Sequence, residues 1–193
     1  MIQEIISKIK GKKLVLFGEI HGTKEIPELL LNLFNYLAKD EDFNLGLEIP
    51  KEFQNVEPDK ILPLLKEIGT RGLISGEYIK LIKEIPENIK LFFIAPNSIK
   101  NQVGMEKEIA DNILKLVDGK RTFVILGNIH ASKNKLEIGS LNIVPAGFII
   151  YQRLKNEMCS VLLKAKGGEF FNDGIRQVAF NEDDFFDKNF DYI

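Results

Sequence analysis

Two histidines are the residues of this chain that most clearly indicate chemistry. They are the only histidines in 193 residues, and both end the same short pattern. The first pattern is Gly18-Glu19-Ile20-His21 after the apolar run 14–17, and the second is Gly127-Asn128-Ile129-His130 after the apolar run 123–126. Each predicts a buried strand that ends in a glycine turn and presents a histidine just beyond it. The duplication indicates one shared functional site.

An acid at the end of another strand completes this set. Residues 45–50, Leu-Gly-Leu-Glu-Ile-Pro, form an apolar run that carries Glu48 and stops at a proline. Parallel strands present their carboxyl ends at one edge of a sheet, and ligands bind there. We therefore expect Glu48 to lie beside His21 and His130. Glu19 is expected at the same edge, either as a fourth catalytic residue or as a partner of a helix dipole.

Two histidines and one or two carboxylates allow two mechanisms, and the sequence leaves both open. In the first, His21 takes a proton from water, because an imidazole titrates near neutral pH. Glu48 holds the tautomer or shares the base role, and His130 and Asn128 stabilise the oxyanion. In the second, His21, His130 and Glu48 bind one divalent ion (zinc, manganese or cobalt) and leave a position open for water.

Further residues are expected near the same edge. Asn97 follows the predicted strand 91–95, and Asn128 lies inside the second histidine pattern, so both are candidate substrate-binding residues. Arg71, one of four arginines, is a third candidate, with an exposed turn as the alternative reading. The chain has no Gly-x-Ser-x-Gly nucleophile motif and no glycine-rich nucleotide motif, which argues against a serine hydrolase and against nucleotide cofactors.

The elements that position these residues alternate between strands and helices. Strands are predicted at 13–17, 43–49, 91–95, 122–126 and 159–163, and helices at 2–10, 23–38 and 98–117. The strands are apolar without alternation, as in sheets covered on both faces. Strands separated by helices indicate a parallel sheet. The predicted class is therefore α/β, with a mainly parallel central sheet flanked by helices.

Three segments depart from this alternation. Residues 51–88 carry two short helical patterns, and we interpret them as a helical insertion that forms a lid or wall over the site. Residues 131–139 are expected to be a polar loop, residues 143–154 fit either a strand or a helix, and residues 178–180 are expected to form an edge strand. The tail 181–193 is acidic and aromatic, and it is expected to dock on its own domain or on a second subunit.

Composition narrows the class of protein. The length predicts a single domain over residues 1–193. A net charge of -2 argues against nucleic acid as a partner. No apolar run is long enough to span a membrane, the first 13 residues do not resemble a signal peptide, and the lone Cys159 fits a reducing compartment. We expect a cytoplasmic protein without a membrane partner, and a homodimer is one option.

The motifs resemble those of the erythromycin esterase and ChaN-like superfamily, which is related to the TraB and Tiki proteins. The matching residues are the Gly-Glu-x-His turn at 18–21, Glu48 at the end of the second strand and the Gly-Asn-x-His turn at 127–130. The helix segment 109–112 is similar to the Met-Ala-x-Asn of the esterases. The resemblance covers about residues 13–170 and implies the same α/β fold with its site on these residues.

The esterases imply a metal-free hydrolase, whereas the Tiki relatives imply a metal-dependent one. We interpret the chain as a small hydrolase of ester or amide bonds that acts on a small-molecule or peptide substrate. The alternative is a ChaN-like protein that holds haem or a metal without turnover. Haem is the weaker cofactor option, with tyrosines available as ligands at positions 36, 78, 151 and 192. A scaffold with a vestigial site is a further alternative.

Overall fold

A five-stranded parallel sheet forms the centre of the molecule, as the sequence predicts. The computed structural model describes residues 1–67, 75–97, 102–165, 169–171, 175–177 and 187–192. The strand order is β3-β2-β4-β1-β7. The strands are β1 (Leu14–Glu19), β2 (Asn44–Pro50), β3 (Lys90–Ala95), β4 (Thr122–Gly127) and β7 (Met158–Leu162). β4 therefore lies between β1 and β2, and the three strands that carry the site motifs are neighbours.

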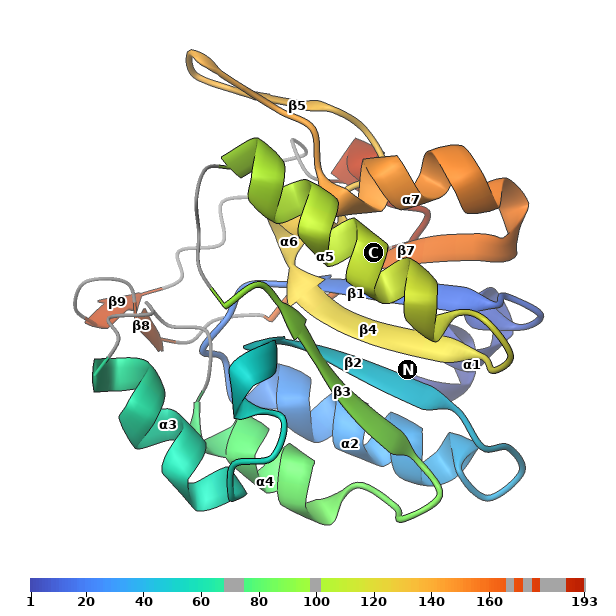
Figure 1. Ribbon diagram of the computed structural model, residues 1–193. Coiled ribbons are helices and arrows are strands. Elements are labelled where there is room, and N and C mark those ends of the chain that lie inside the picture. Colours follow the sequence, from blue (N-terminus) through green and yellow to red (C-terminus); the bar gives the residue numbers. More distant parts are fainter. Residues whose placement is uncertain (68–74, 98–101, 166–168, 172–174, 178–186, 193) are drawn as a thin grey trace.

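Helices cover both faces of this sheet (Figure 1). One face packs against α1 (Ile2–Ile9), α2 (Glu25–Leu37), α3 (Pro58–Glu67) and α4 (Gly76–Glu84). The other face packs against α5 (Gln102–Leu116), α6 (Asn128–Ala131) and α7 (Ala146–Leu154). This arrangement explains the unbroken apolar strand sequences, because both faces of each central strand are buried.

Side chains of the same strand enter two separate cores. Phe17 of β1 stacks on Phe123 of β4, with ring centroids 6.2 Å apart, on the α2 side. Leu16, its neighbour in sequence, belongs to the core under α5 and α7. Phe34 and Phe43 complete the aromatic group on the α2 side. The central strands are thus packed between two hydrophobic cores, one on each face of the sheet, and this packing fixes where their carboxyl ends lie.

The expected helices of the segment 51–88 are present. A short 3-10 helix, η1 (Lys51–Phe53), precedes α3 and α4. Two of the helices, α2 and α4, begin without a side-chain cap hydrogen bond. Helix α2 has Lys24 at its N-cap position, and the buried Thr23 makes no capping bond. Ser75 does occupy the N-cap position of α4, but its side chain forms no cap hydrogen bond. The lid-or-wall role of this segment remains a prediction.

The segment after His130 is the part that the sequence predicts least well. The expected polar loop 131–139 is wrong, because β5 (Leu136–Ile138) and β6 (Leu141–Ile143) form an antiparallel hairpin. Gly139 turns this hairpin with a φ of 60°. The ambiguous segment 143–154 is mainly helix α7. A second hairpin, β8 (Glu169–Phe171) with β9 (Ile175–Gln177), was not expected. The predicted strand 178–180 lies outside the described residues.

The end of the chain docks on its own domain. After η2 (Lys155–Glu157) and β7, the chain returns at η3 (Asp187–Asn189). Tyr192 forms a parallel bridge with Val161 on the free edge of β7, and the Asp191 carboxylate accepts a bond from the Ser160 N–H. Phe190 covers Gly18 so closely that a Cβ at that glycine would lie 2.5 Å from the ring. The tail thus closes one sheet edge beside the first histidine turn.

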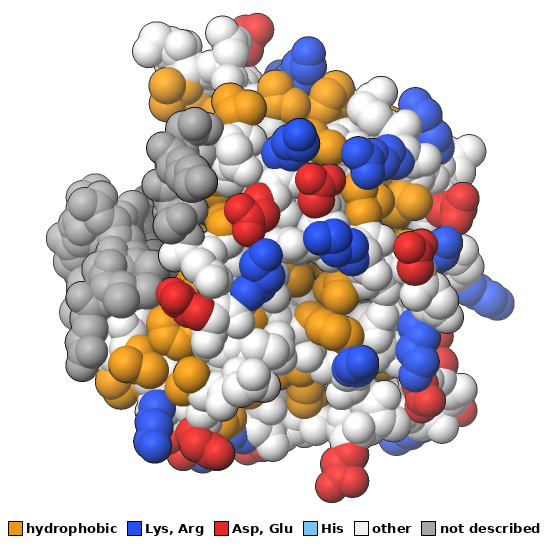
Figure 2. Space-filling view, viewed as in Figure 1, with side chains coloured by type: hydrophobic (Ala, Val, Ile, Leu, Met, Phe, Trp, Pro, Cys, Tyr) orange, Lys and Arg blue, Asp and Glu red, His pale blue; other side chains and the backbone are white. Residues whose placement is uncertain are grey.

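The surface carries both signs of charge. On the face shown in Figure 2, Lys and Arg side chains alternate with Asp and Glu and do not gather in one basic area. Of the helices in the described part of the chain, none has the length and apolar character needed to cross a membrane.

Replacing Phe190 with alanine tests the docking of the tail. The ring is buried, so Phe190→Ala is expected to lower the free energy of unfolding by about 3 kcal/mol, as for other buried phenylalanines. Urea denaturation measures this change. Leu141→Ala is the matched control, because Leu141 is 63 % exposed and its loss is expected to change stability by less than about 0.5 kcal/mol. Equal effects of the two substitutions would contradict the docking.

Candidate functional site

The carboxyl ends of the three central strands bring the predicted catalytic residues together. Glu19 is the last residue of β1, and His21 follows it in the turn. Glu48 lies near the end of β2, and His130 lies in the short helix α6 directly after β4. Both carboxylates are buried, with 1 % and 5 % of their surface exposed. The sheet edge therefore holds two acids and two imidazoles in one cluster.

Glu48 is the centre of this cluster because it faces both histidines. Its Oε2 lies 3.5 Å from Nε2 of His21, and its Oε1 lies 3.4 Å from Nε2 of His130. The Gly127 N–H also donates a 2.7 Å hydrogen bond to Oε2. One buried carboxylate thus joins all three strands, and the two imidazoles point toward it with the same ring nitrogen.

Each histidine is fixed from behind by a second buried carboxylate. His21 Nδ1 lies 2.8 Å from Glu19 Oε1, and His130 Nδ1 lies 2.8 Å from Glu106 Oε1. Such a bond sets the orientation of the ring and leaves Nε2 for chemistry. The order along the cluster is Glu19, His21, Glu48, His130 and Glu106. Glu19 therefore holds the His21 ring, a role that the metal-free hypothesis gave to Glu48.

Glu106 is a site residue that the sequence analysis missed. It lies on α5 and is 1 % exposed. Both its oxygens are occupied: Oε1 also accepts a 2.6 Å bond from Gln102, and Oε2 accepts a 2.8 Å bond from the Ala146 N–H. The available signal was its place in an otherwise apolar stripe of α5, followed by Ile109, Ala110 and Ile113.

Gly127 leaves room for the cluster. A Cβ at this position would lie 3.1 Å from His21 Nε2, 3.5 Å from His130 Cδ2 and 3.7 Å from Glu48 Oε2. A side chain here would therefore press on His21 and would lie in ordinary contact with His130 and Glu48. The glycine in the second motif is thus required by the close approach of its backbone to the site, and its N–H is used at the same time.

The charges of the cluster shift the pKa values of its members strongly. Burial disfavours protonated His21, but Glu19 and Glu48 outweigh burial and raise the pKa of this histidine from 6.5 to about 10. For His130, Glu48 and Glu106 outweigh burial in the same way and raise the pKa to about 9. Burial alone would raise the pKa of Glu48, yet the two histidines and the Gly127 N–H lower it to about 2. At neutral pH the cluster holds two imidazoliums between three glutamates.

The predicted substrate-binding residues lie in different surroundings. Asn128 is half-buried at the start of α6, where its Oδ1 accepts a bond from the Ile129 N–H. Asn97 is exposed, and its Oδ1 accepts a 3.0 Å bond from the Glu52 N–H, which joins the end of β3 to η1. Arg71 lies outside the described residues. Substrate binding by these three residues remains a prediction.

The hypothesised metal set of His21, His130 and Glu48 is not supported by the geometry. Within the described ranges, no group of three or more His, Cys, Asp or Glu side chains is arranged to hold a metal ion. Both Glu48 oxygens already face imidazoles as ion-pair partners, and Oε2 also accepts a backbone bond. The site residues therefore fit an ionic hydrogen-bonded cluster better than a coordination sphere.

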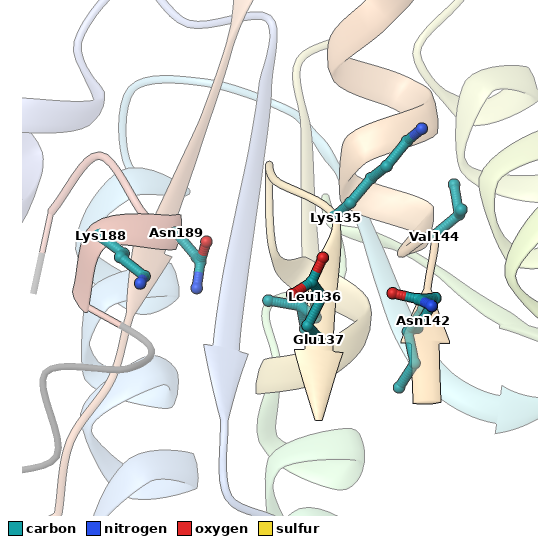
Figure 3. A pocket seen from close by; sticks show the side chains of 8 residues that line it. Lys135, Leu136, Glu137, Asn142, Val144, Lys188 and Asn189 are labelled. Carbon is teal, nitrogen blue, oxygen red and sulfur yellow. The ribbon is translucent and has the colours of Figure 1, made fainter. Parts of the chain in front are cut away.

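The space beside these histidines is small among the described residues, and haem binding remains a prediction. The pocket there is lined by Glu19, His21, Glu48, Tyr78 and three apolar side chains, and its volume of about 10 Å³ is close to that of one water molecule. A larger cavity of about 500 Å³ lies between the β5–β6 hairpin and η3, lined by residues such as Leu136 and Asn189 (Figure 3). None of the predicted site residues lines that cavity.

Comparison with known proteins identifies the fold. No protein-family model and no curated protein sequence matches the chain. Solved structures do match. A Bacillus cereus protein aligns with a TM-score of 0.68 at 11 % identity, over 96 % of this chain and 76 % of that one. A mutant of the erythromycin esterase EreC aligns with a TM-score of 0.56 at 11 % identity, over 83 % and 72 %.

The third similar structure is ChaN of Campylobacter jejuni with cofacially bound haem, with a TM-score of 0.51 at 14 % identity, over 85 % of this chain and 86 % of that one. The layered arrangement places the chain among proteins with a parallel sheet covered by helices on both faces. More narrowly, it has the erythromycin esterase/ChaN-like fold, as the motifs indicated. The link to TraB and Tiki proteins remains a prediction.

Replacing Glu106 with glutamine tests the pairing of His130. Without this negative charge, the pKa of His130 is expected to fall from about 9 toward its ordinary 6.5. NMR titration of the imidazole signals measures the shift, and His21→Ala assigns them because the chain has only two histidines. Glu108→Gln is the matched control, since Glu108 lies on the same helix but pairs with Lys51 at the surface.

The same substitution has a consequence for stability. A histidine whose pKa is raised on folding stabilises the fold below its unfolded pKa, and that stabilisation is lost as the pH rises through the folded pKa. The loss of stability caused by Glu106→Gln is therefore expected to be larger at pH 6 than at pH 10. An unchanged titration of His130 in this variant would contradict the pairing.

Proposed function

We propose that the chain is a hydrolase of ester or amide bonds that uses His21, Glu48 and His130 to activate water. The observation that supports this proposal is the convergence of two imidazoles on one carboxylate, each with its Nδ1 held by a further buried acid. Paired titratable groups with strongly shifted pKa values, grouped at the carboxyl edge of a parallel sheet, are typical of catalytic sites. The similarity to EreC agrees with this choice at the level of the fold.

In the proposed reaction, one histidine acts as base and the other stays protonated. Water forms a bond to the carbonyl carbon while one of its protons passes to Nε2 of neutral His21. The carbonyl π electrons move to oxygen, and the imidazolium of His130 and the Asn128 amide stabilise that oxyanion. When the tetrahedral intermediate collapses, the bond to the leaving alcohol or amine breaks, and His21 returns the proton to it.

The three glutamates keep these roles separate. Glu19 and Glu106 fix the two rings and allow each to carry charge in a buried site. Glu48 lies between the Nε2 atoms and compensates the positive charge that remains on either ring. The small pocket of the cluster is lined by His21 and not by His130, which supports His21 as the base.

The first test of this function is hydrolysis of small aryl esters by the wild type and by His21→Ala. The substitution is expected to lower kcat/KM by about 10²- to 10⁴-fold, because a positioned base contributes about that much. His130→Ala is expected to reduce the rate as well. Since the chain has no other histidine, free imidazole at equal concentration is the control for unspecific catalysis.

Ester hydrolysis that survives in both histidine variants would contradict the proposal. A red preparation with a Soret band would instead favour a haem-binding function, for which the similarity to ChaN is the supporting observation at fold level.

The pH dependence gives a second test of the function. At pH 7 both histidines of the free protein are protonated, because their pKa values are raised to about 9 and about 10. Raising the pH removes one of the two protons, and a further rise removes the other. The reactive form is the singly protonated cluster in which His21 is neutral and His130 keeps the proton. Because the pKa of His130 (about 9) lies below that of His21 (about 10), this is the less populated of the two singly protonated forms. The profile of kcat/KM is therefore expected to rise from pH 7 to about 9 and to fall above about 10. A rising limb near pH 6.5 would mean that the base lies outside this ionic cluster.

A further inference from the structure

We propose that Tyr78 is a further catalytic residue, whose hydroxyl group and the Oε2 atom of Glu19 hold the attacking water next to His21. This inference rests on the proposed hydrolase function and specifies where its nucleophile is bound. It also gives the helical segment 51–88 a role, because Tyr78 lies on α4.

Two buried oxygen atoms lead to this proposal. Tyr78 is 4 % exposed and Glu19 is 1 % exposed. Among the described residues, the Tyr78 hydroxyl and Glu19 Oε2 make no hydrogen bond of normal geometry, and the one polar contact of the hydroxyl is a poorly aligned one with the Glu19 carboxylate. Burying a polar atom without a well-formed hydrogen bond is costly, so two such atoms at one site call for an explanation. By contrast, both oxygens of Glu106 on the other side of the cluster are bonded.

The two atoms belong to residues that line the same pocket. Its polar wall consists of Glu19, His21, Glu48 and Tyr78, and its remaining wall is apolar, formed by Leu47, Ile49 and Ile125. The volume of about 10 Å³ is close to that of one water molecule and far from that of a larger ligand. A water needs two to four polar partners to be bound in a protein, and four polar side chains line this wall.

The protonation of Tyr78 suits this role. Burial, the negative charge of Glu19 with its hydrogen-bonding contact, and the charge of Glu48 raise the pKa of the hydroxyl well above 10, so it stays a donor at every pH at which the protein is assayed. The water accepts a bond from this hydroxyl and donates one to Glu19 Oε2. Its second proton is then directed toward His21, and its remaining lone pair is available to the substrate carbonyl.

Replacing Tyr78 with phenylalanine separates this role from a structural one. The ring stays, and the removed oxygen has only a poorly aligned contact with Glu19, so Tyr78→Phe is expected to keep or raise the Tm. The same variant is expected to lose roughly 10- to 100-fold in kcat with little change in KM, because the water is no longer positioned. Tyr36→Phe is the matched control, since Tyr36 is 40 % exposed and lies outside the pocket.

The outcomes distinguish this inference from the function on which it rests. An active wild type with an equally active Tyr78→Phe would overturn the role of Tyr78 and leave the hydrolase intact. A lower Tm together with a lower kcat would also overturn it, because the hydroxyl would then be structural. If the wild type hydrolyses no ester or amide, the hydrolase fails, and a high-resolution crystal structure decides the water site. A water bonded to Tyr78 and Glu19 supports it, and a pocket filled otherwise overturns it.

Discussion

The sharing of the buried Glu48 carboxylate between two imidazoles is the interaction on which the rest of the site depends. A buried charge is costly unless it is paired and hydrogen-bonded. Glu48 meets this condition with His21, His130 and the Gly127 N–H. The histidines then need negative partners of their own, which Glu19 and Glu106 supply. Each imidazolium thus lies between two carboxylates, and Glu48 is the carboxylate that both share.

The fold supplies the positions that this pairing requires. β4 lies between β1 and β2, so the ends of three neighbouring strands meet within hydrogen-bond distance of one carboxylate. Glycine allows the approach at two points: Gly127 faces His21, and Gly18 lies against Phe190 of the docked tail. The C-terminal segment, far away in sequence, thereby packs against the turn that carries the first histidine. Sheet order, glycine turns and tail act together on one edge.

Most of the fold and the inner part of the site could be predicted, because their signals are local. The apolar runs indicated all five strands of the central sheet, and the repeated glycine–histidine pattern with Glu48 indicated the shared edge. The pairing of Glu106 with His130 could not be predicted this way, because the two residues are 24 positions apart and only the packing of α5 brings them together. The place of the Tyr78 hydroxyl in the site could not be predicted either, because Tyr78 belongs to the apolar side of α4 together with Ile79 and Leu81. The β5–β6 hairpin was missed because its strands have three residues each, although Gly139-Ser140 is a suitable two-residue turn.

The two halves of the cluster look alike but differ in one physical respect. On the His130 side, both carboxylate oxygens of Glu106 are hydrogen-bonded to protein groups. These bonds hold the carboxylate, and with it the His130 ring, in one position. Around His21 one Glu19 oxygen and the Tyr78 hydroxyl make no well-aligned hydrogen bond, and the small pocket lies on this side. A fixed cation suits stabilisation of an oxyanion that forms at a constant position. The His21 side, where hydrogen-bonding capacity remains, suits a group that must bind and release water and protons in each turnover. In the proposed hydrolase, the asymmetry of hydrogen bonding favours His21 as the base and His130 in the electrostatic role, although both rings come from the same sequence pattern.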